Sequence, residues 1–464
     1  MSWTERDTEK FYDEHDSTYR AFWDPDGSLH WGLYEREPAA DGSDYLAACF
    51  AAKQRLLAAL AGVGPGCHVL DIGCGNGNSA LWLAARTGAA VTGIDISGVR
   101  VANAQAKAAM HPDLPVQFRR GSAVDLPFAA ETFTHIWSQA TLYHVHERQR
   151  ALVEIARVLR DGGVLAFDDL VQPREQVSDL AKAYVYDRLL FGPTYSHASY
   201  KEALAQAGLR VVEDDDWSKH LGRSYVALAA RAAGGNPELQ EAYGKMTHAI
   251  RGGDVGWSFF KALRVRDPLA WIYDESGAVC LERKYDAWAP TYEADVGPDY
   301  HAIVRTAAHR FAALLPAPDV DLLDIGSGTG LVGEALREAG VARLTGLEPS
   351  AGMRCLSERR RVYQRVHAAT LEDLACAGGD GFDAALAVGV FTHGHVPLEN
   401  LALALSLVRS GGILGVVLRD DLASGATFDL VSRQLHARQV GQETIGTFDG
   451  VPMRLFAWHR LPDA

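Results

Sequence analysis

The sequence predicts two consecutive α/β domains, each a mostly parallel seven-stranded sheet with helices on both faces. Three observations support this. The chain has 464 residues, more than one ordinary hydrophobic core organises, so two domains are expected. Both halves alternate short apolar, β-branched runs with longer helical patterns, an order typical of parallel sheets. A glycine-rich phrase also occurs twice, as VLDIGCGNGN at 69–78 and as LLDIGSGTGLVG at 322–333.

Composition limits the classes of protein that fit. Hydrophobic residues make up 48% and charged residues 22% of the chain, as in soluble globular proteins. No apolar run reaches about 18 residues, and the N-terminal MSWTERDTEKFYDEHD is acidic where a secretory signal is basic and then apolar. We therefore expect a cytoplasmic protein without a membrane partner.

Charge and cysteine content exclude further classes. A net charge of −14 argues against nucleic acid as the main partner, because a polyanion needs a basic face. The six cysteines are scattered without CxxC spacing, so neither a zinc site nor disulfides are expected. Arginine outnumbers lysine by 36 to 9, a usage that indicates a GC-rich bacterial genome.

The first half contains seven candidate strands separated by helical patterns. The last of them, GWSFFKALRVRD at 256–267, is apolar enough to close the sheet. The expected strands are CHVLDI (67–72), AVTGIDI (90–96), VQFRRG (116–121), THIWSQ (134–139), GGVLAFDD (162–169), the start of 210–221, and 256–267. The expected helices are 79–88, 99–110, 148–160 and most of 224–254.

The second half repeats this order with nearly the same spacing. Asp71 precedes Asp95 by 24 residues, and Asp324 precedes Glu348 by 24, so each glycine loop is followed by an acidic residue at the same distance. This internal repeat indicates two homologous domains. The expected strands are 320–325, 342–348, 362–369, 382–389, 411–421 and the closing strands within 432–461, with helices at 331–340, 352–360 and 398–410.

The boundary between the domains is expected near residue 268, giving domains 1–268 and 269–464. The segment from Val171 to Gln206 is longer than a bare crossover between strands. We expect it to form a lid or a wall of the substrate site.

The glycine loops indicate the kind of ligand. Both read Asp-x-Gly-x-Gly-x-Gly, which is not the G-x-G-x-x-G spacing of dinucleotide sites. At an effective dielectric of ~20, an aspartate ~5 Å from a phosphate charge is repelled by about 3 kcal/mol, whereas an ammonium group would be attracted. Asp95 and Glu348 can accept hydrogen bonds from both hydroxyls of a ribose. The predicted ligand is a ribonucleoside with a cationic, phosphate-free tail.

These residues resemble the class I S-adenosylmethionine-dependent methyltransferases, whose first motif is this loop and whose next acidic residue binds the ribose. The resemblance implies two Rossmann-like methyltransferase domains, one S-adenosylmethionine in each, and S-adenosylhomocysteine as product. In the first half, WSQATLYHV (137–145) and LHWGLYE (29–35) resemble the sarcosine and dimethylglycine N-methyltransferases and tocopherol methyltransferases. In the second, KYDAWAPTYEADV (284–296) resembles small methyltransferase-like proteins with a YDxWAxxYE segment over the cofactor.

The resemblance also implies the cofactor-binding residues of each domain. In the first domain they are Asp71, Gly73, Gly75, Asn76, Gly77, Asp95, Ile96, Ser122, Ala123, Ser138, Gln139 and Trp31. In the second they are Tyr285, Trp288, Tyr292, Asp324, Gly326, Ser327, Gly328, Thr329, Gly330, Glu348, Pro349, Leu371, Glu372 and Gly389.

Residues that follow the fourth strand face the transferable methyl group in such a fold. In the first domain His144 is the preferred base, because imidazole titrates near neutral pH, with Tyr143 and His30 orienting it. A structural role for His144 in capping or within the loop is an equal alternative. In the second domain His393 and His395 are expected near the methyl group. Their spacing could suit a metal, but no third ligand is apparent, so no metal is predicted.

We expect a tandem methyltransferase acting on a small-molecule acceptor, such as an amine, an amino acid derivative or a secondary metabolite, with one methylation per domain. One alternative keeps catalysis in the first domain and gives the second a regulatory or structural role. Others are a non-catalytic S-adenosylmethionine sensor and an enzyme that uses the sulfonium for a different reaction, such as a cyclisation. The sequence leaves the acceptor atom open.

Overall fold

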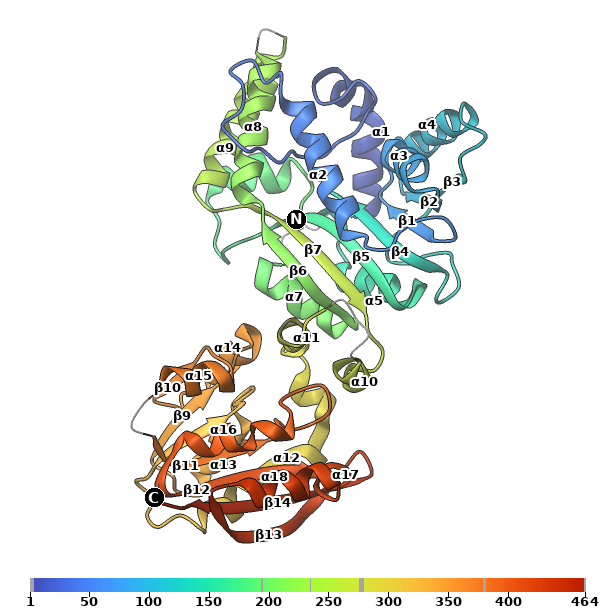
Figure 1. Ribbon diagram of the computed structural model, residues 1–464. Helices are drawn as coiled ribbons and strands as arrows, with labels where there is room; N and C mark the ends of the chain where they lie inside the picture. The colour runs from blue at the N-terminus through green and yellow to red at the C-terminus, as the bar shows by residue number, and fades with distance from the viewer. Residues whose placement is uncertain (1–3, 193–194, 234, 275–278, 379–380, 463–464) are drawn as a thin grey trace. The chain divides into compact units, whose positions relative to one another are not determined.

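The computed structural model describes residues 4–192, 195–233, 235–274, 279–378 and 381–462. The chain divides into two compact units, Met1–Arg266 and Asp267–Ala464 (Figure 1). This division lies within two residues of the boundary expected near 268. Each unit has its own seven-stranded sheet and its own hydrophobic cores.

The sheet of the first unit has the strand order β3-β2-β1-β4-β5-β7-β6. Its strands are parallel except β7, which runs antiparallel to both of its neighbours. The order reverses between β1 and β4, and ligands of open α/β sheets bind in the crevice at such a reversal. The strands are β1 (His68–Ile72), β2 (Ala90–Asp95), β3 (Val116–Arg120), β4 (Phe133–Gln139), β5 (Leu159–Val171), β6 (Leu209–Asp216) and β7 (Gly256–Arg264).

Helices cover both faces of this sheet, because successive strand residues point to opposite sides. Val69 packs into the core beneath α2, α3 and α8, whereas Leu70 packs into the core beneath α5 and α7. The helices are α1 (Glu5–Phe22), α2 (Tyr45–Ala59), α3 (Asn78–Thr87), α4 (Gly98–Ala109), η1 (Leu142–His144), α5 (Arg148–Val158), α6 (Asp179–Ala181), η2 (Lys182–Asp187), α7 (His197–Gln206), α8 (Ser218–Ala232) and α9 (Pro237–Arg251).

The second unit repeats the topology with the order β10-β9-β8-β11-β12-β14-β13, in which β14 is the antiparallel strand. The strands are β8 (Asp321–Ile325), β9 (Arg343–Leu347), β10 (Arg365–His367), β11 (Phe382–Val388), β12 (Val408–Arg419), β13 (Ala437–Phe448) and β14 (Val451–Arg460). The helices are α10 (Pro268–Tyr273), α11 (Leu281–Trp288), α12 (Tyr292–Ala312), α13 (Leu331–Glu338), α14 (Ala351–Arg359), α15 (Leu371–Ala377), η3 (Leu398–Asn400), α16 (Leu401–Ser406), α17 (Asp420–Ala423) and α18 (Ala426–Gln434).

The predicted fold class is confirmed, since both units are mostly parallel seven-stranded sheets with helices on both faces. Segment 171–206 contains α6, η2 and α7, and its Phe191 ring lies 5.5 Å from that of Tyr143, on the loop after β4. Pro193 and Thr194 of this segment lie outside the described residues.

Two properties of the described residues concern membranes and metal ions. No helix in this part of the chain is long and apolar enough to cross a membrane. Within the same residues, no three His, Cys, Asp or Glu side chains are grouped as metal ligands would be.

Candidate functional site

Each unit has a pocket at the carboxyl ends of its central strands, built around the glycine loop. The first two glycines of each loop adopt positive φ, 75° and 51° at Gly73 and Gly75, and 68° and 52° at Gly326 and Gly328. A Cβ on Gly73 would lie 2.2 Å from the side chain of Thr141, and one on Gly326 would lie 2.5 Å from Val390. Glycine is therefore required by conformation and by close packing at both positions.

The third glycine of each loop has a different role. Gly77 and Gly330 precede α3 and α13 in the left-handed conformation and are not among the residues that line the pockets. A Cβ on Gly77 would meet Ala104 and Phe118 at 2.8 Å. We conclude that the third glycine allows the loop to pack closely against the rest of the domain.

The acidic residues that end the second strands are held identically in the two domains. Asp95 accepts hydrogen bonds from the backbone N–H groups of Gly75 and Ser97, both at 2.9 Å. Glu348 accepts them from Gly328 at 2.9 Å and from Ser350 at 2.8 Å.

This arrangement fixes each carboxylate between the glycine loop and the start of the next helix. Each carboxylate oxygen keeps a lone pair for a further donor, as a ribose would supply. Burial raises the pKa of Asp95 above its usual value and that of Glu348 to about 7.

The aspartates that begin the loops differ between the domains. Asp71 lines the first pocket, and its Oδ2 is buried with no hydrogen-bond partner among the described residues. Asp324 does not line the second pocket; its Oδ2 accepts a 2.5 Å hydrogen bond from the Tyr363 hydroxyl, and its Oδ1 is buried with no hydrogen-bond partner among the described residues. Burial raises the pKa of both carboxyls to about 7. An ammonium group could thus pair directly with Asp71 but not with Asp324.

Residues that follow the second and third strands of each sheet line the pockets. Ala123 and Ile96 line the first pocket; Leu371, Glu372 and Pro349 line the second. The structure does not place Ser122 in the first pocket, because its hydroxyl donates to Glu5 of α1 and accepts from the Val124 N–H.

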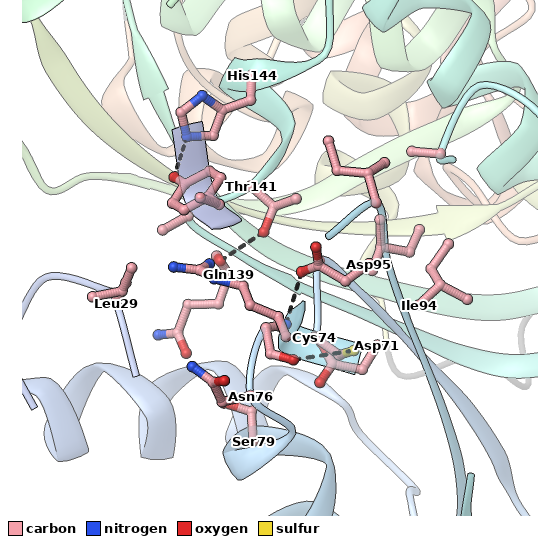
Figure 2. A pocket seen from close by; sticks show the side chains of 18 of the residues that line it. Leu29, Asp71, Cys74, Asn76, Ser79, Ile94, Asp95, Gln139, Thr141 and His144 are labelled. Atoms are coloured by element: carbon pink, nitrogen blue, oxygen red, sulfur yellow. Dashed lines mark hydrogen bonds between the residues drawn. The ribbon is translucent and has the colours of Figure 1, made fainter. Parts of the chain in front are cut away.

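A helix from the N-terminal part of each unit covers the pocket and joins a tyrosine to the histidine after the fourth strand. In the first unit the Tyr12 hydroxyl is hydrogen-bonded to Nε2 of His144. In the second the Tyr285 hydroxyl lies 2.7 Å from Nε2 of His395. All four residues line the pockets, and Figure 2 shows His144 and Thr141 at the opposite end of the first pocket from Asn76 and Ser79.

The residue after each tyrosine fastens the same helix to the ribose side of the pocket. Asp13 accepts a hydrogen bond from the Ser97 hydroxyl, and Asp286 accepts one from the Ser350 hydroxyl at 2.6 Å. Asp16 adds contacts to the first unit alone: it pairs with Arg100 at 3.5 Å and accepts from Asn76 at 3.0 Å. When Tyr12 is aligned with Tyr285, Ala289 occupies the position of Asp16.

The tyrosine–histidine pairing was not predicted from the sequence, although a signal was present. YDEHDSTY at 12–19 and YDAWAPTY at 285–292 share Tyr-Asp at the start and Thr-Tyr at the end. The repeat thus includes the covering helices as well as the glycine loops. Tyr143 and His30 were expected to orient His144; the Tyr143 ring lies 3.9 Å from the His144 ring, and the hydrogen bond to Nε2 comes from Tyr12.

Burial controls the protonation of the pocket histidines. It lowers the pKa of His144 to about 3, helped by the charges of Arg100 and Arg148, and lowers that of His30 to about 3 as well. His144 in the unliganded protein therefore does not titrate near neutral pH, contrary to the sequence-based reason for choosing it. Burial also lowers the pKa of His395.

The tautomer of His395 follows from its partners. Its Nδ1 lies 2.8 Å from the backbone carbonyl of His393, which can only accept, so Nδ1 carries the proton. Nε2 of the neutral ring then accepts from the Tyr285 hydroxyl.

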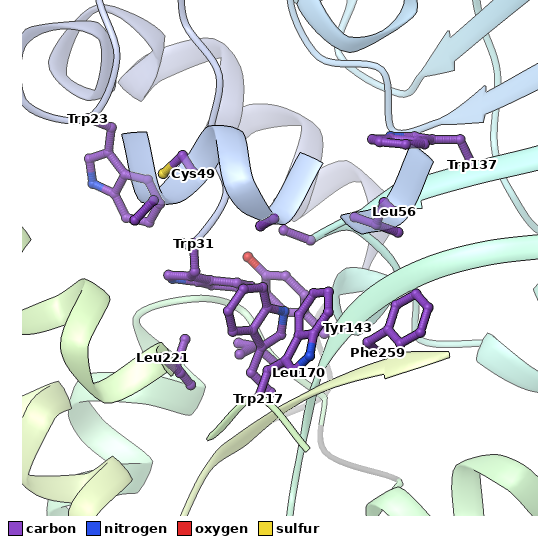
Figure 3. Packing of buried hydrophobic residues seen from close by; sticks show 14 of the residues in the cluster. Trp23, Trp31, Cys49, Leu56, Trp137, Tyr143, Leu170, Trp217, Leu221 and Phe259 are labelled. Carbon is purple, nitrogen blue, oxygen red and sulfur yellow. The ribbon is translucent and has the colours of Figure 1, made fainter. Parts of the chain in front are cut away.

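Nine predicted site residues lie outside the cofactor pockets: Gly77, Gly330, Ser122 and Asp324, described above, and Trp31, Tyr143, Ser138, Trp288 and His393. Trp31 is buried in the aromatic core of the first unit (Figure 3). Its ring lies 5.8 Å from that of Trp257. Tyr143 packs against Phe191, and the Ser138 hydroxyl donates to the carbonyl of Ile72 within the sheet. In the second unit, Trp288 donates its indole N–H to Asp295, and His393 is exposed.

The remaining predicted residues line the pockets. In the first unit they are Asp71, Gly73, Gly75, Asn76, Asp95, Ile96, Ala123, Gln139, His30 and His144. In the second they are Tyr285, Tyr292, Gly326, Ser327, Gly328, Thr329, Glu348, Pro349, Leu371, Glu372, Gly389 and His395.

The pockets fit S-adenosylmethionine. Each has a backbone cradle that a Cβ would obstruct, and each has a carboxylate fixed in place with lone pairs to spare. In the first pocket the unpartnered oxygen of Asp71 suits the ammonium group of the methionine tail. Asp95 and Glu348 would hold the ribose.

Two methyltransferase-domain family models match the chain, one over residues 70–167 and a different one over residues 299–453. Methyltransferase GfsG of Streptomyces halstedii is 32% identical over 219 residues, which cover 46% of this chain and 76% of that protein. The 27-O-demethylrifamycin SV methyltransferase of Amycolatopsis mediterranei is 32% identical over 220 residues, 45% of this chain and 75% of that protein.

The glycine/sarcosine/dimethylglycine N-methyltransferase of Actinopolyspora halophila is 30% identical over 254 residues, 50% of this chain and 43% of that protein. A crystal structure of a putative sarcosine dimethylglycine methyltransferase from Galdieria sulphuraria shares the fold, with a TM-score of 0.50 and 20% identity over 55% of this chain and 99% of that one. The chain belongs to the S-adenosylmethionine-dependent methyltransferases and carries two methyltransferase domains in tandem.

Proposed function

We propose that the chain methylates small-molecule acceptors at two separate sites, one in each domain, each with its own S-adenosylmethionine. The observation that carries this proposal is the tyrosine–histidine pair, which occurs in both pockets at the carboxyl end of the fourth strand. A domain kept only for structure or regulation has no need of that pair. The names of the GfsG, rifamycin and sarcosine relatives support methyl transfer, and the last two name small-molecule acceptors.

The residues of each pocket have distinct tasks. S-adenosylmethionine, when bound, would supply a methyl group attached to a positively charged sulfur. The sulfur keeps the electrons of the carbon–sulfur bond when that bond breaks and so becomes neutral. Asp95 and Glu348, each held by a loop N–H group, would hold the ribose, and the glycine loops would let the ligand approach the backbone closely. Helices α1 and α11 cover the pockets and exclude water, which favours in-line displacement by an aligned acceptor.

An acceptor that carries a proton must lose it, and the tyrosine–histidine pairs can take it. The proton passes to the tyrosine oxygen while the tyrosine proton moves to Nε2 of the histidine. In the second domain the carbonyl of His393 then stabilises the imidazolium through Nδ1–H. In the first domain Arg100 and Arg148 oppose that charge, so the second site is better suited to an acceptor that must be deprotonated.

Two substitutions in the full chain test the proposal. Asp95→Ala and Glu348→Ala should each remove one of two S-adenosylhomocysteine equivalents in calorimetry, and each should abolish a different methylation measured by product mass. Exposed Asp113→Ala and Glu358→Ala serve as matched controls. If one substitution removed all methylation, or if one removed none, two independent sites would be refuted.

A further inference from the structure

The second domain contains a further cavity that adjoins its cofactor pocket. Tyr285, Tyr292, Tyr300 and Gly389 line both spaces. Gly389 directly follows β11, at the sheet edge where the acceptor must meet the cofactor. The cavity therefore begins beside the Tyr285–His395 pair and extends away from the glycine loop.

The walls of this cavity are mainly aromatic and aliphatic. They come from α10, α11 and α12 on one side and from β12, β14 and the end of β13 on the other, with the loop after β11 between them. The lining residues are Leu269, Ile272, Tyr273, Tyr285, Trp288, Tyr292, Val296, Tyr300, Gly389, Phe391, Thr392, Val417, Arg419, Phe448 and Met453. Such walls suit a ligand with a ring that can pack face or edge against them.

The charges around the cavity select a neutral ligand. Among the described lining residues there is no carboxylate, and Arg419 is the one charged side chain. Arg419 disfavours a cation, and its own charge is matched by Asp421 at 3.2 Å, so no free charge attracts an anion. An ammonium acceptor would find no carboxylate partner among the described lining residues, so the lining favours a neutral ligand.

Two polar groups could bind an oxygen of the ligand. The Oγ1 atom of Thr392 is buried, and no described residue makes a hydrogen bond to it. At the mouth of the cavity, the Tyr285 hydroxyl is hydrogen-bonded to Nε2 of His395. A phenol has a pKa near 10, far below that of an aliphatic alcohol, so its proton is the easier one for this pair to take.

We propose that this cavity binds the acceptor of the second domain, and that the acceptor is a neutral aromatic compound with a phenolic hydroxyl. The inference rests on the proposed methyl transfer by the second domain. The phenol oxygen uses a lone pair to form the new bond to carbon, its proton goes to the Tyr285–His395 pair, and the electrons of the broken bond stay on sulfur.

In the first domain, aromatic side chains pack beside β5. Trp217 and Trp257, with ring centroids 4.8 Å apart, fill the core beside β5, and the Trp257 indole N–H donates to Asp168 at 2.9 Å. The lining of its pocket near His144 includes the polar residues His30, Gln139 and Thr141. The two domains thus select different acceptors.

Binding is tested first, without turnover. Fluorine NMR of 4-fluorophenol with the full chain and saturating S-adenosylhomocysteine should show one saturable site, and 4-fluorobenzylamine should not compete. Val417→Phe fills the cavity and should weaken 4-fluorophenol binding at least tenfold; Thr392→Val keeps the shape and should weaken it about fivefold. Val440→Phe, on the exposed part of β13, is the control.

Calorimetry on each variant shows whether both S-adenosylhomocysteine equivalents are retained, which separates loss of the cavity from misfolding. Absence of binding, or equal binding in wild type, Val417→Phe and Thr392→Val, overturns the proposal. Methylation of 4-fluorophenol is then followed by product mass in Asp95→Ala, where the first site is silenced. Saturable binding without any methyl transfer would support the cavity and refute the proposed catalysis by the second domain.

Discussion

Each domain has its own cofactor site of the same type, but the two sites are closed in different ways. In the first, α1 is held by Asp13 and also by Asp16, which joins Arg20, Arg100 and Asn76. In the second, Asp286 is the counterpart of Asp13, and no aspartate corresponds to Asp16. The second pocket is also larger, about 1350 Å³ compared with about 980 Å³ for the first, both volumes including the open mouth. The two domains therefore hold the ribose-side carboxylate in the same way and differ in the cover and on the acceptor side.

The largest expected difference concerns the loop aspartates. Asp71→Asn should weaken S-adenosylmethionine binding to the first site by about 3 kcal/mol, roughly 150-fold, because a buried charge partner is removed from the pocket. Asp324→Asn should weaken the second site much less, because Asp324 lies behind the loop and is bonded to Tyr363. Calorimetry of each variant measures the cofactor affinity of the altered site, with the other site silenced by Glu348→Ala or Asp95→Ala. Equal losses would show that the two aspartates act alike.

The covering tyrosines should differ in their effect on turnover. Tyr285→Phe interrupts the route from acceptor to His395 and should lower kcat of the second-site methylation roughly 100-fold. Tyr12→Phe should lower the first-site kcat less, because the neighbouring arginines already make His144 a weak base. Cofactor stoichiometry should remain two in both variants. A larger loss for Tyr12→Phe would reverse the assignment of proton removal to the second site.

Cofactor affinity should fall as pH drops below 7. Asp71 and Glu348 have pKa values raised to about 7 by burial, and ligand binding favours their ionised forms. Protonation should weaken each site roughly 15-fold between pH 7 and pH 5.5.

The same raised pKa values destabilise the unliganded fold as pH rises. The stability that these groups contribute is present below their ordinary values of 3.8 and 4.5 and is lost as pH rises through 7. Added cofactor should therefore raise Tm more at pH 7.5 than at pH 5.5. Calorimetry across pH checks the affinities, and Asp71→Asn or Glu348→Gln should flatten the profile of its own site only.

The extra anchor of α1 predicts a smaller effect confined to the first domain. Asp16→Asn should weaken the contacts to Arg20 and Arg100 and speed S-adenosylhomocysteine release from the first site about tenfold, for a loss of about 1.5 kcal/mol. Stopped-flow displacement measures the rate. Unchanged release would show that Asp13 and Tyr12 suffice to hold the helix.

The smallest effect concerns the packing beneath the covering helices. A Cβ on Gly352 of α14 would lie 3.0 Å from the backbone of Asp286, whereas one on Gly98 of α4 would meet nothing within 4 Å. Gly352→Ala should therefore destabilise the second unit by about 1 kcal/mol, and Gly98→Ala should stabilise the first by about 0.5 kcal/mol. Thermal denaturation measures the Tm shift of each variant, and equal shifts would contradict a close contact between Gly352 and the backbone of Asp286.

Much of the site could be predicted because it is local in sequence. Gly75, which has a positive φ, and Asp95, 20 residues later, belong to one strand–loop–helix–strand unit, so spacing indicates that both lie at the same end of the sheet. The same reasoning indicated Gly328 and Glu348. The fold class followed from the alternation of strand and helix patterns, which both halves repeat.

Tertiary structure decided what distant segments do. Tyr12 reaches His144 across 132 residues, and Tyr285 reaches His395 across 110, contacts that depend on how a helix packs over the sheet rather than on any local preference. Burial is also a property of the tertiary structure: it lowers the pKa of His144 to about 3. The same packing places Trp31 in the core and not in the cofactor pocket. The sequence by itself determined two α/β domains and their paired cofactor loops; the three-dimensional packing determined the covering helices, the protonation of the pockets and the aromatic cavity.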